Sequence, residues 1–195
     1  MPFSDDYLRS IVTGKVVGDF PPFTSGSISK TDNYIHKVVA RLSSIATLLV
    51  EADFSSYGSG FASFVEVRVS RKDQSDTSIS TSNQRVTYDT TGLVLYISRL
   101  TPYWFYGSSK WSKTYDQGQL TGGLRMYLNP DSQAIINQVL WQHNQQRVAA
   151  VLQEFRYGLL TPEELRQPAP AGIHIPTELA EKPYTVFDCF FYWQD

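Results

Sequence analysis

Apolar residues follow a helical period near the beginning of the chain. Between residues 31 and 50 they recur every three to four positions, the spacing of a helix with one buried face: Ile35, Val38, Val39, Leu42, Ile45, Ala46 and Leu49. We predict a helix over about 31–50, although its β-branched end, Ile45–Val50, would also suit a strand. Ser4 followed by two aspartates is typical of a helix start and predicts a shorter helix over about 5–13.

The period changes to two at Phe61. Val65, Val67 and Val69 alternate with bulkier or charged residues, which predicts a strand with one apolar face. The following stretch, Lys72–Asn83, is almost wholly polar and rich in serine and threonine. Such a composition favours a mobile connection.

Several further strands are expected after this connection. We predict strands over Gln84–Asp89 and Leu93–Leu100, separated by a turn at Thr90–Gly92, and two or three more within Tyr103–Tyr127. Because short turns join successive strands, antiparallel pairing is favoured over crossover connections. The main sheet is therefore expected over about 61–127.

The last third of the chain carries clear helix signals and one strongly apolar segment. Asn129–Asp131 (NPD) predicts the start of a long helix over about 131–157. Thr161–Glu164 (TPEE) is a capping box with proline at the first helical position, and it predicts a short helix that ends before Pro168. The segment Tyr184–Trp193 (YTVFDCFFYW) is apolar on both faces, which favours a central strand.

These elements define an α+β fold. The chain of 195 residues has the length of one domain, and we assign residues 1–195 to a single α+β domain. Its sheet is expected to be mainly antiparallel and twisted, with about five to seven strands and with helices packed on one face.

Charge and cysteine content narrow the class of protein. The net charge of −2 gives no basic face for nucleic acid or anionic lipid, so neither is expected as a partner. The single cysteine, Cys189, excludes an intrachain disulfide and favours a reducing compartment. Neither a signal peptide nor a run of eighteen apolar residues is present in the sequence, and a cytoplasmic protein is predicted.

The sequence offers few candidates for catalysis. The three histidines lack metal-ligand spacing and the glycine-rich stretches lack nucleotide-binding spacing, so no metal and no cofactor are predicted. Cys189, in an apolar segment, is interpreted as an inert core residue, and no catalytic residue is assigned. Asp188 would need a basic partner if it were buried, and Arg99 and Arg125 are the candidates, which makes these three residues the candidate polar groups of a site.

Aromatic residues gather in one segment. Seven of the twenty residues from Tyr96 to Tyr115 are aromatic, compared with 14% of the whole chain. Neighbouring rings point to opposite faces of a strand, so half of them need cover from a helix, a partner or a ligand. The candidate binding face consists of Tyr103, Trp104, Tyr106 and Trp111. The alternative is that the long helix covers these rings and makes them core.

Three functions remain open on this evidence. The first is a non-catalytic protein-binding module of the inhibitor or immunity type, favoured by the surplus aromatic residues and the lack of a catalytic motif. The second is a small-molecule-binding domain or enzyme with a pocket on the aromatic-rich sheet. The third is a homo-oligomeric subunit whose strands pair across a two-fold axis.

Overall fold

The computed structural model describes residues 3–195 and confirms an α+β fold. Within these residues the main sheet has seven strands, all antiparallel to their neighbours except for one short parallel pair between β6 and β8. The order along the sheet is β1-β3-β5-β6-β7, with β4 beside β5 and β8 beside β6. The bounds are β1 (Leu48–Asp53), β3 (Phe64–Arg71), β4 (Thr77–Ser82), β5 (Arg85–Ser98), β6 (Tyr103–Asp116), β7 (Gln119–Gly122) and β8 (Gly158–Leu159).

Alternation along the strands gives the sheet two chemically different faces. One face, here called the aliphatic face, carries Val65, Val67 and Val69 of β3 together with Leu93, Leu95 and Ile97 of β5. The opposite face, here called the aromatic face, carries Phe64, Tyr96 and Phe105. Each face therefore carries its own hydrophobic cluster.

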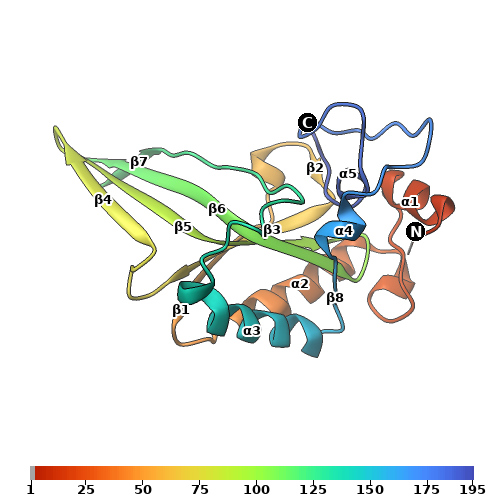
Figure 1. Cartoon of the computed structure of the whole chain (residues 1–195), viewed down its shortest axis with the longest axis horizontal. Helices are drawn as coiled ribbons and strands as arrows, with labels where there is room; N and C mark the ends of the chain where they lie inside the picture. The colour runs from red at the N-terminus through yellow and green to blue at the C-terminus, as the bar shows by residue number, and fades with distance from the viewer. Residues whose placement is uncertain (1–2) are drawn as a thin grey trace.

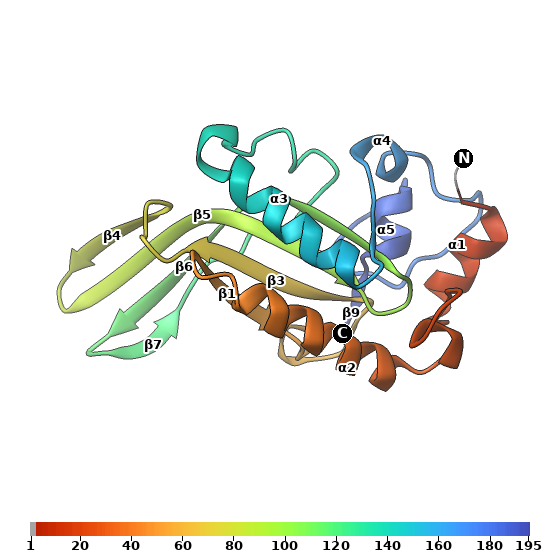
Figure 2. The same ribbon diagram turned by 90° about the horizontal axis from the view of Figure 1, so that it is seen from below.

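The two long helices cover the aliphatic face. Helices α2 (Ile28–Ser43) and α3 (Gln138–Glu154) lie side by side across it, as Figure 2 shows. Their buried residues Ile35, Leu42, Val148 and Leu152 belong to the same cluster as the sheet valines. Removing this apolar surface from water is the main stabilising contribution on this side of the sheet.

Short helices and the C-terminal segment cover one end of the aromatic face. The elements are α1 (Asp5–Val12), α4 (Pro162–Leu165), α5 (Val186–Phe190) and the two-stranded pair β2 (Phe61–Ala62) and β9 (Trp193–Gln194). The ring of Phe187 packs 5.8 Å from that of Phe105, and the ring of Phe191 packs 5.6 Å from that of Tyr96, each measured between centroids. This end of the face is consequently dry core.

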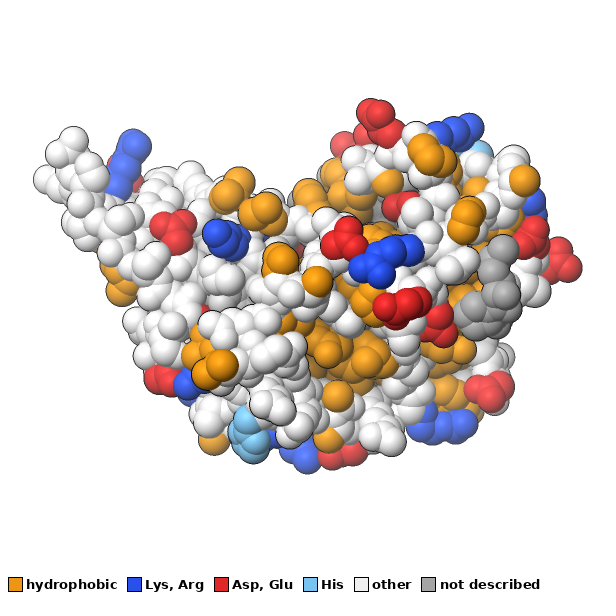
Figure 3. All heavy atoms as spheres, in the orientation of Figure 1, with side chains coloured by type: hydrophobic (Ala, Val, Ile, Leu, Met, Phe, Trp, Pro, Cys, Tyr) orange, Lys and Arg blue, Asp and Glu red, His pale blue; other side chains and the backbone are white. Residues whose placement is uncertain are grey.

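Strands β5 and β6 continue past the covered end and form a projecting arm (Figure 1). We use the word arm for residues 77–91 and 110–122, which comprise β4, β7 and the adjoining halves of β5 and β6. Between the arm and the C-terminal part of the chain the outline of the molecule is hollowed, as Figure 3 shows. The arm lies at the far end of the sheet from α1.

The first half of the chain departs from the sequence prediction in three places. The helix predicted over 31–50 covers Ile28–Ser43. The alternative of a strand at Ile45–Val50 is confirmed for its last three residues, which begin strand β1, whereas residues 45–47 form the turn before it. The two strands predicted on either side of Thr90–Gly92 are one continuous strand, β5. The polar stretch Lys72–Asn83 is not merely a connection, because it contains β4, which pairs with β5 along its whole length.

The C-terminal half contains two further corrections. The helix predicted over 131–157 begins only at Gln138, because Asn137 caps it by accepting a hydrogen bond from the Leu140 amide. The predicted strand Tyr184–Trp193 is wrong, since Val186–Phe190 form helix α5. The capping box predicted at Thr161 is confirmed at the start of α4.

Candidate functional site

The floor of the candidate site is the indole ring of Trp111. Trp111 lies on the aromatic face of β6, and its ring packs on Gly92 of the neighbouring strand. A Cβ atom at Gly92 would lie 2.5 Å from Trp111 Cη2 and 2.5 Å from the carbonyl oxygen of Val69. Only glycine leaves room for the ring at this position. Trp111 is only 7% exposed, so little of its indole ring is open to the solvent.

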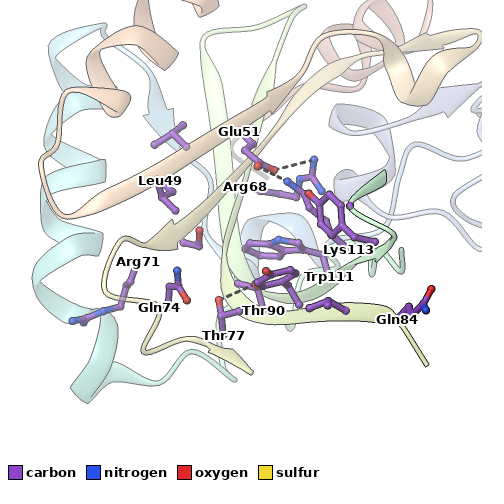
Figure 4. Close-up of a pocket in the computed structure, with 16 residues that line it drawn as sticks. Leu49, Glu51, Arg68, Arg71, Gln74, Thr77, Gln84, Thr90, Trp111 and Lys113 are labelled. Carbon is purple, nitrogen blue, oxygen red and sulfur yellow. Dashed lines mark hydrogen bonds and ion pairs between the residues drawn. The ribbon is translucent and has the colours of Figure 1, made fainter. Parts of the chain in front are cut away.

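A groove opens above this floor where the arm joins the body of the sheet. Its volume is about 630 Å³, and its walls come from five strands, β1, β3, β4, β5 and β6, and from the β3–β4 connection. Leu49 and Glu51 of β1 stand on one side, and Tyr88 of β5 and Tyr115 of β6 stand on the arm. Figure 4 shows Trp111 near the middle of the lining residues. We call this space the arm groove.

Three charged side chains meet at one wall of the arm groove. Glu51 accepts a hydrogen bond from Lys113 Nζ and lies 3.5 Å from Arg68 Nη2 (Figure 4). The side chain of Glu51 is 47% exposed and that of Lys113 is 31% exposed, so water screens this pair. An acidic group of a ligand would find the same two cations within reach.

A buried carboxylate lies beside this wall, two residues from Arg68 on β3. Glu66 has a side chain that is 1% exposed, and its Oε2 accepts a hydrogen bond from the Tyr57 hydroxyl at 3.1 Å. Its Oε1 lies 3.5 Å from Arg125 Nε and 3.8 Å from Arg68 Nε. Burial raises the pKa of Glu66 above its ordinary value, although Arg125 and Arg68 act to lower it.

Arg125 links the buried carboxylate to a second acid. Its Nη1 donates a hydrogen bond to Asp53 Oδ2 at 3.1 Å, and its guanidinium stacks on the Tyr57 ring at 4.7 Å from the centroid. Burial alone would raise the pKa of Asp53, but hydrogen bonds from Ser55 and Arg125 outweigh it and hold this pKa below the ordinary value. Arg125 is thus held by two carboxylates, and its backbone bridges to Trp111, the floor of the groove.

The structure separates the four aromatic residues of the predicted binding face. Trp111 is the floor of the arm groove, whereas Trp104 is buried on the aliphatic face. Tyr106 is half-buried and stacks on Trp104 with 5.3 Å between centroids. Tyr103 packs against Phe190 at the covered end of the aromatic face. These four rings do not form one surface.

The three candidate polar groups also lie apart. Asp188 is part of the cap of α5, where Oδ2 accepts hydrogen bonds from the Thr185 amide at 2.7 Å and hydroxyl at 2.9 Å. Arg99 is 3% exposed and donates to Asp32, and also to Ser56 Oγ and to the carbonyl oxygens of Phe54 and Ala62. Only Arg125 adjoins the groove. The pairing of Asp188 with Arg99 or Arg125 is therefore wrong.

Several groove residues were missed in the sequence. Arg68, Tyr88 and Lys113 occupy three different strands, and only the strand register brings them together: Tyr88 lies directly opposite Lys113. One signal was available, because Trp111, Lys113 and Tyr115 recur with period two and must share a face.

Two kinds of reactive group can be checked directly, a metal-binding cluster and the thiol of Cys189. Across residues 3–195 no group of three histidine, cysteine, aspartate or glutamate side chains is arranged to hold a metal ion. Burial, followed by the charge of Asp188, raises the pKa of Cys189 to about 12, so its thiolate is not accessible at neutral pH. Within the same residues, no helix is both long and apolar enough to span a membrane.

Comparisons of the chain with protein-family models, with curated proteins and with solved structures give no match.

Proposed function

We propose that this protein is a non-catalytic binding module that holds a segment of a partner protein in the arm groove, a class that includes inhibitors and immunity proteins. One observation carries the proposal. The aromatic face of the arm presents apolar side chains that no other part of residues 3–195 covers, while the reverse face of the arm is polar. Apolar side chains that stay exposed on one face of the arm do not stabilise the protein by themselves. We therefore infer that a partner covers them.

The contrast between the two faces of the arm is strong. On the aromatic face Ile79 is 54% exposed and Tyr88 is 37% exposed, and Leu49 at the edge of the groove is 47% exposed. The reverse face consists of serine, threonine and charged residues, namely Ser78, Ser80, Ser82, Arg85, Thr87, Asp89, Thr91, Lys110, Ser112, Thr114 and Asp116. Such one-sided apolar exposure is typical of an interaction surface.

The composition of the groove favours a protein segment as the ligand. Tyrosine, tryptophan and arginine are the residues that most often dominate binding energy at interfaces, and Tyr88, Trp111 and Arg68 line the groove together. The groove has 16 lining residues, whereas a standard interface between whole domains uses about 20–30 residues on each side. A loop, strand or tail of the partner fits this size better than a broad flat surface.

The proposal can be tested by site-specific photo-cross-linking. A photoreactive phenylalanine analogue at Tyr88 would face the groove, while the same analogue at Thr87 would face the polar reverse side. We expect a single partner to be captured in the source cells from Tyr88 and not from Thr87. The purified partner should then bind the native protein, and Tyr88→Ala should weaken that binding by about tenfold or more. Equal capture from both positions, or undiminished binding by Tyr88→Ala, would contradict the proposal.

A small-molecule ligand is the second candidate, because the volume of about 630 Å³ falls within the range of about 300–1,000 Å³ typical of such pockets. A flat acidic compound could lie against the exposed ring of Tyr88 and reach Lys113 and Arg68. Titration of a panel of aromatic carboxylates, followed by tryptophan fluorescence, tests this alternative. Saturable one-to-one quenching that disappears in Lys113→Met would favour a small molecule over a protein segment.

The proposed setting of this binding protein is the cytoplasm. The support is the free thiol of Cys189, the single cysteine of the chain, which is fully buried and has no disulfide partner. Fractionation of the source cells with an antibody against the native protein would test the location.

A further inference from the structure

The outer edge of strand β4 has free backbone groups. Across residues 3–195 β4 pairs only with β5, through the register Thr77↔Thr90 to Ser82↔Arg85. The amide of Thr91 donates to the carbonyl oxygen of Asp76 at 2.9 Å, which fixes the phase of the ladder. Because hydrogen-bonded and non-hydrogen-bonded pairs alternate, the backbone groups of even-numbered residues of β4 bond to β5, and those of the odd-numbered Ile79 and Thr81 point away from it. The amide of Thr77, at the start of the strand, donates to the carbonyl oxygen of Gln74 at 3.0 Å.

The residues at this edge carry none of the features that protect edge strands. Ile79 and Thr81 direct their N–H and C=O groups into solvent, and the strand Thr77–Ser82 contains no charged residue and no proline. Natural edge strands are normally protected by lysine, proline or a bulge against pairing with another chain. The unprotected edge indicates that another strand pairs with it.

Five of the six residues of β4 form a palindrome centred on Ile79. Residues 77–81 read Thr-Ser-Ile-Ser-Thr in both directions. In an antiparallel pair of two such strands centred on Ile79, Thr77 lies opposite Thr81 of the second copy, and Ser78 lies opposite Ser80. Each pair is alike, uncharged and of matched size, and threonine pairs across strands are favourable.

We propose that β4 pairs antiparallel with β4 of a second copy of this chain, with Ile79 opposite Ile79 on a two-fold axis perpendicular to the sheet. This interface joins the two arms into one continuous sheet. It extends beyond the proposed function, because it uses the outer edge of the arm and leaves both arm grooves open on the same side. The exposed Ile79 side chains then contact each other beside the two Tyr88 rings.

The size of this interface sets its strength. β4 has only six residues, whereas a stable dimer uses about 20–30 residues per side and about 800 Å² per partner. The dimer is therefore weak and exchanges rapidly, and a measurement that traps it is more informative than one that requires it to persist.

Cysteine cross-linking at the two-fold axis provides such a trap. Residues in a hydrogen-bonded antiparallel pair have Cα atoms about 5.5 Å apart, which lies within the range of about 4.4–6.8 Å that a disulfide spans. We expect Ile79→Cys to form a disulfide-linked dimer under mild oxidation. The native Cys189 is fully buried and does not compete.

The matched control is Leu120→Cys. Leu120 lies on β7 of the same arm and is 61% exposed, slightly more than Ile79, but β7 is at the opposite edge of the arm from β4. If two copies of β4 pair before oxidation, the two thiols introduced at position 79 are held close together. Ile79→Cys should then cross-link about tenfold faster than Leu120→Cys at equal concentration. Equal rates would overturn the proposal.

A backbone variant tests the same contact without a thiol. Thr81→Pro removes an outward N–H that does not bond to β5, while Thr81→Val keeps it. In sedimentation velocity from micromolar to millimolar concentration, the native protein and Thr81→Val should show a rising sedimentation coefficient, and Thr81→Pro should not. Circular dichroism checks that all three are folded. Association of Thr81→Pro as strong as that of the native chain, or a monomeric native protein at every concentration, would refute the pairing.

Discussion

The two ends of the aromatic face use the same kind of residue for different purposes. At the covered end, Phe64, Tyr96 and Phe105 are at most 1% exposed and pack against α5 and the C-terminal segment. On the arm, Tyr88 and Tyr115 stand on the same strands as Tyr96 and Phe105 and on the same face, yet remain partly exposed beside Trp111. The strands are continuous between the two ends, so the strands themselves are not the source of the difference.

The difference comes from what the rest of the chain places over each end. Helix α5 and the segments around it follow β6 by many residues and return only to the covered end. Aromatic rings contribute to stability when other side chains close over them, and they are available for binding when none do. Exposure is therefore a property of topology, and the following substitutions test where the border lies.

The largest effect should come from truncating one ring at each end. Phe105→Ala should lower the free energy of unfolding by about 3–5 kcal/mol, because it leaves a cavity in a dry core. Tyr88→Ala should lower it by only about 1 kcal/mol, because the ring is partly exposed and its aromatic contact is the ring of Tyr115. Urea denaturation measures both values. If Tyr88→Ala lowered the free energy of unfolding nearly as much as Phe105→Ala, the arm would also be core, and the two ends of the face would not differ.

A similar but somewhat smaller effect is expected at Arg99, which ties together the segments that close the covered end. Arg99→Met leaves several buried acceptors without a donor and should cost about 3 kcal/mol. Arg41 is the matched control, since its ion pair with Glu154 is half exposed and Arg41→Met should cost at most about 1 kcal/mol. Similar losses for the two variants would mean that Arg99 is not the anchor that its contacts indicate.

An intermediate effect is expected where the groove floor meets the sheet. Gly92→Ala places a methyl group against the Trp111 ring and the Val69 carbonyl group, and should cost about 1–3 kcal/mol. It should also shift the tryptophan emission, because the indole must move. Gly122→Ala on the same arm has no heavy atom within 4 Å of the new methyl group and should do neither. An unchanged emission spectrum for Gly92→Ala would show that the Trp111 ring does not pack on residue 92.

The smallest effect should be a pH dependence at the border between the two ends, where Glu66 lies. Its folded pKa is raised above the ordinary value of 4.5, so the folded protein holds this proton more tightly than the unfolded chain does. The stabilising contribution of Glu66 is complete below pH 4.5 and is lost as the pH rises through the folded pKa. The stability of Glu66→Gln relative to the native protein should therefore increase with pH above 4.5.

Asp53 should show the opposite sign. Its folded pKa is lowered, so its contribution is present above the ordinary value of 3.8 and is lost as the pH falls through the folded pKa. Asp53→Asn should accordingly destabilise the protein more at pH 6 than at pH 3. Thermal unfolding of the two variants across this range gives the test, and slopes of the same sign would contradict the assignment of these two carboxylates.

The sequence was informative where a local rule decides the structure. The Thr161 capping box and the period-two pattern of Val65, Val67 and Val69 each depend on neighbours in the sequence, and both are confirmed. The α+β class follows from the same patterns. These features need no knowledge of what packs on them.

The C-terminal segment shows where a local rule was outweighed by another. Tyr184–Trp193 is rich in aromatic and β-branched residues, which favour a strand in isolation. In the structure Thr185 and Asp188 form a capping box, and Val186, Cys189 and Phe190 are buried in the cluster that also contains α1. The Thr-x-x-Asp spacing was a visible cue, but burial on several sides decided the outcome.

The arm groove required information that the sequence does not carry locally. Period two shows that Trp111 and Lys113 share a face, but not that Tyr88 and Arg68 stand beside them. That depends on the register of three strands and on the end of the sheet at which the chain returns. Aromatic enrichment alone could not separate Tyr96, which is core, from Tyr115, which lines the groove.

The polar reverse face of the arm has a consequence for local unfolding of the protein. Among residues 3–195 no helix covers either face of the arm at its free end. The strands there are held together by backbone hydrogen bonds and by few buried apolar contacts. Such a segment opens at a lower free energy than the rest of the fold, as a separate cooperative unit. Amide protons of β4 and of the adjoining half of β5 would then exchange with solvent through local opening. Those of β3 would exchange only when the whole protein unfolds.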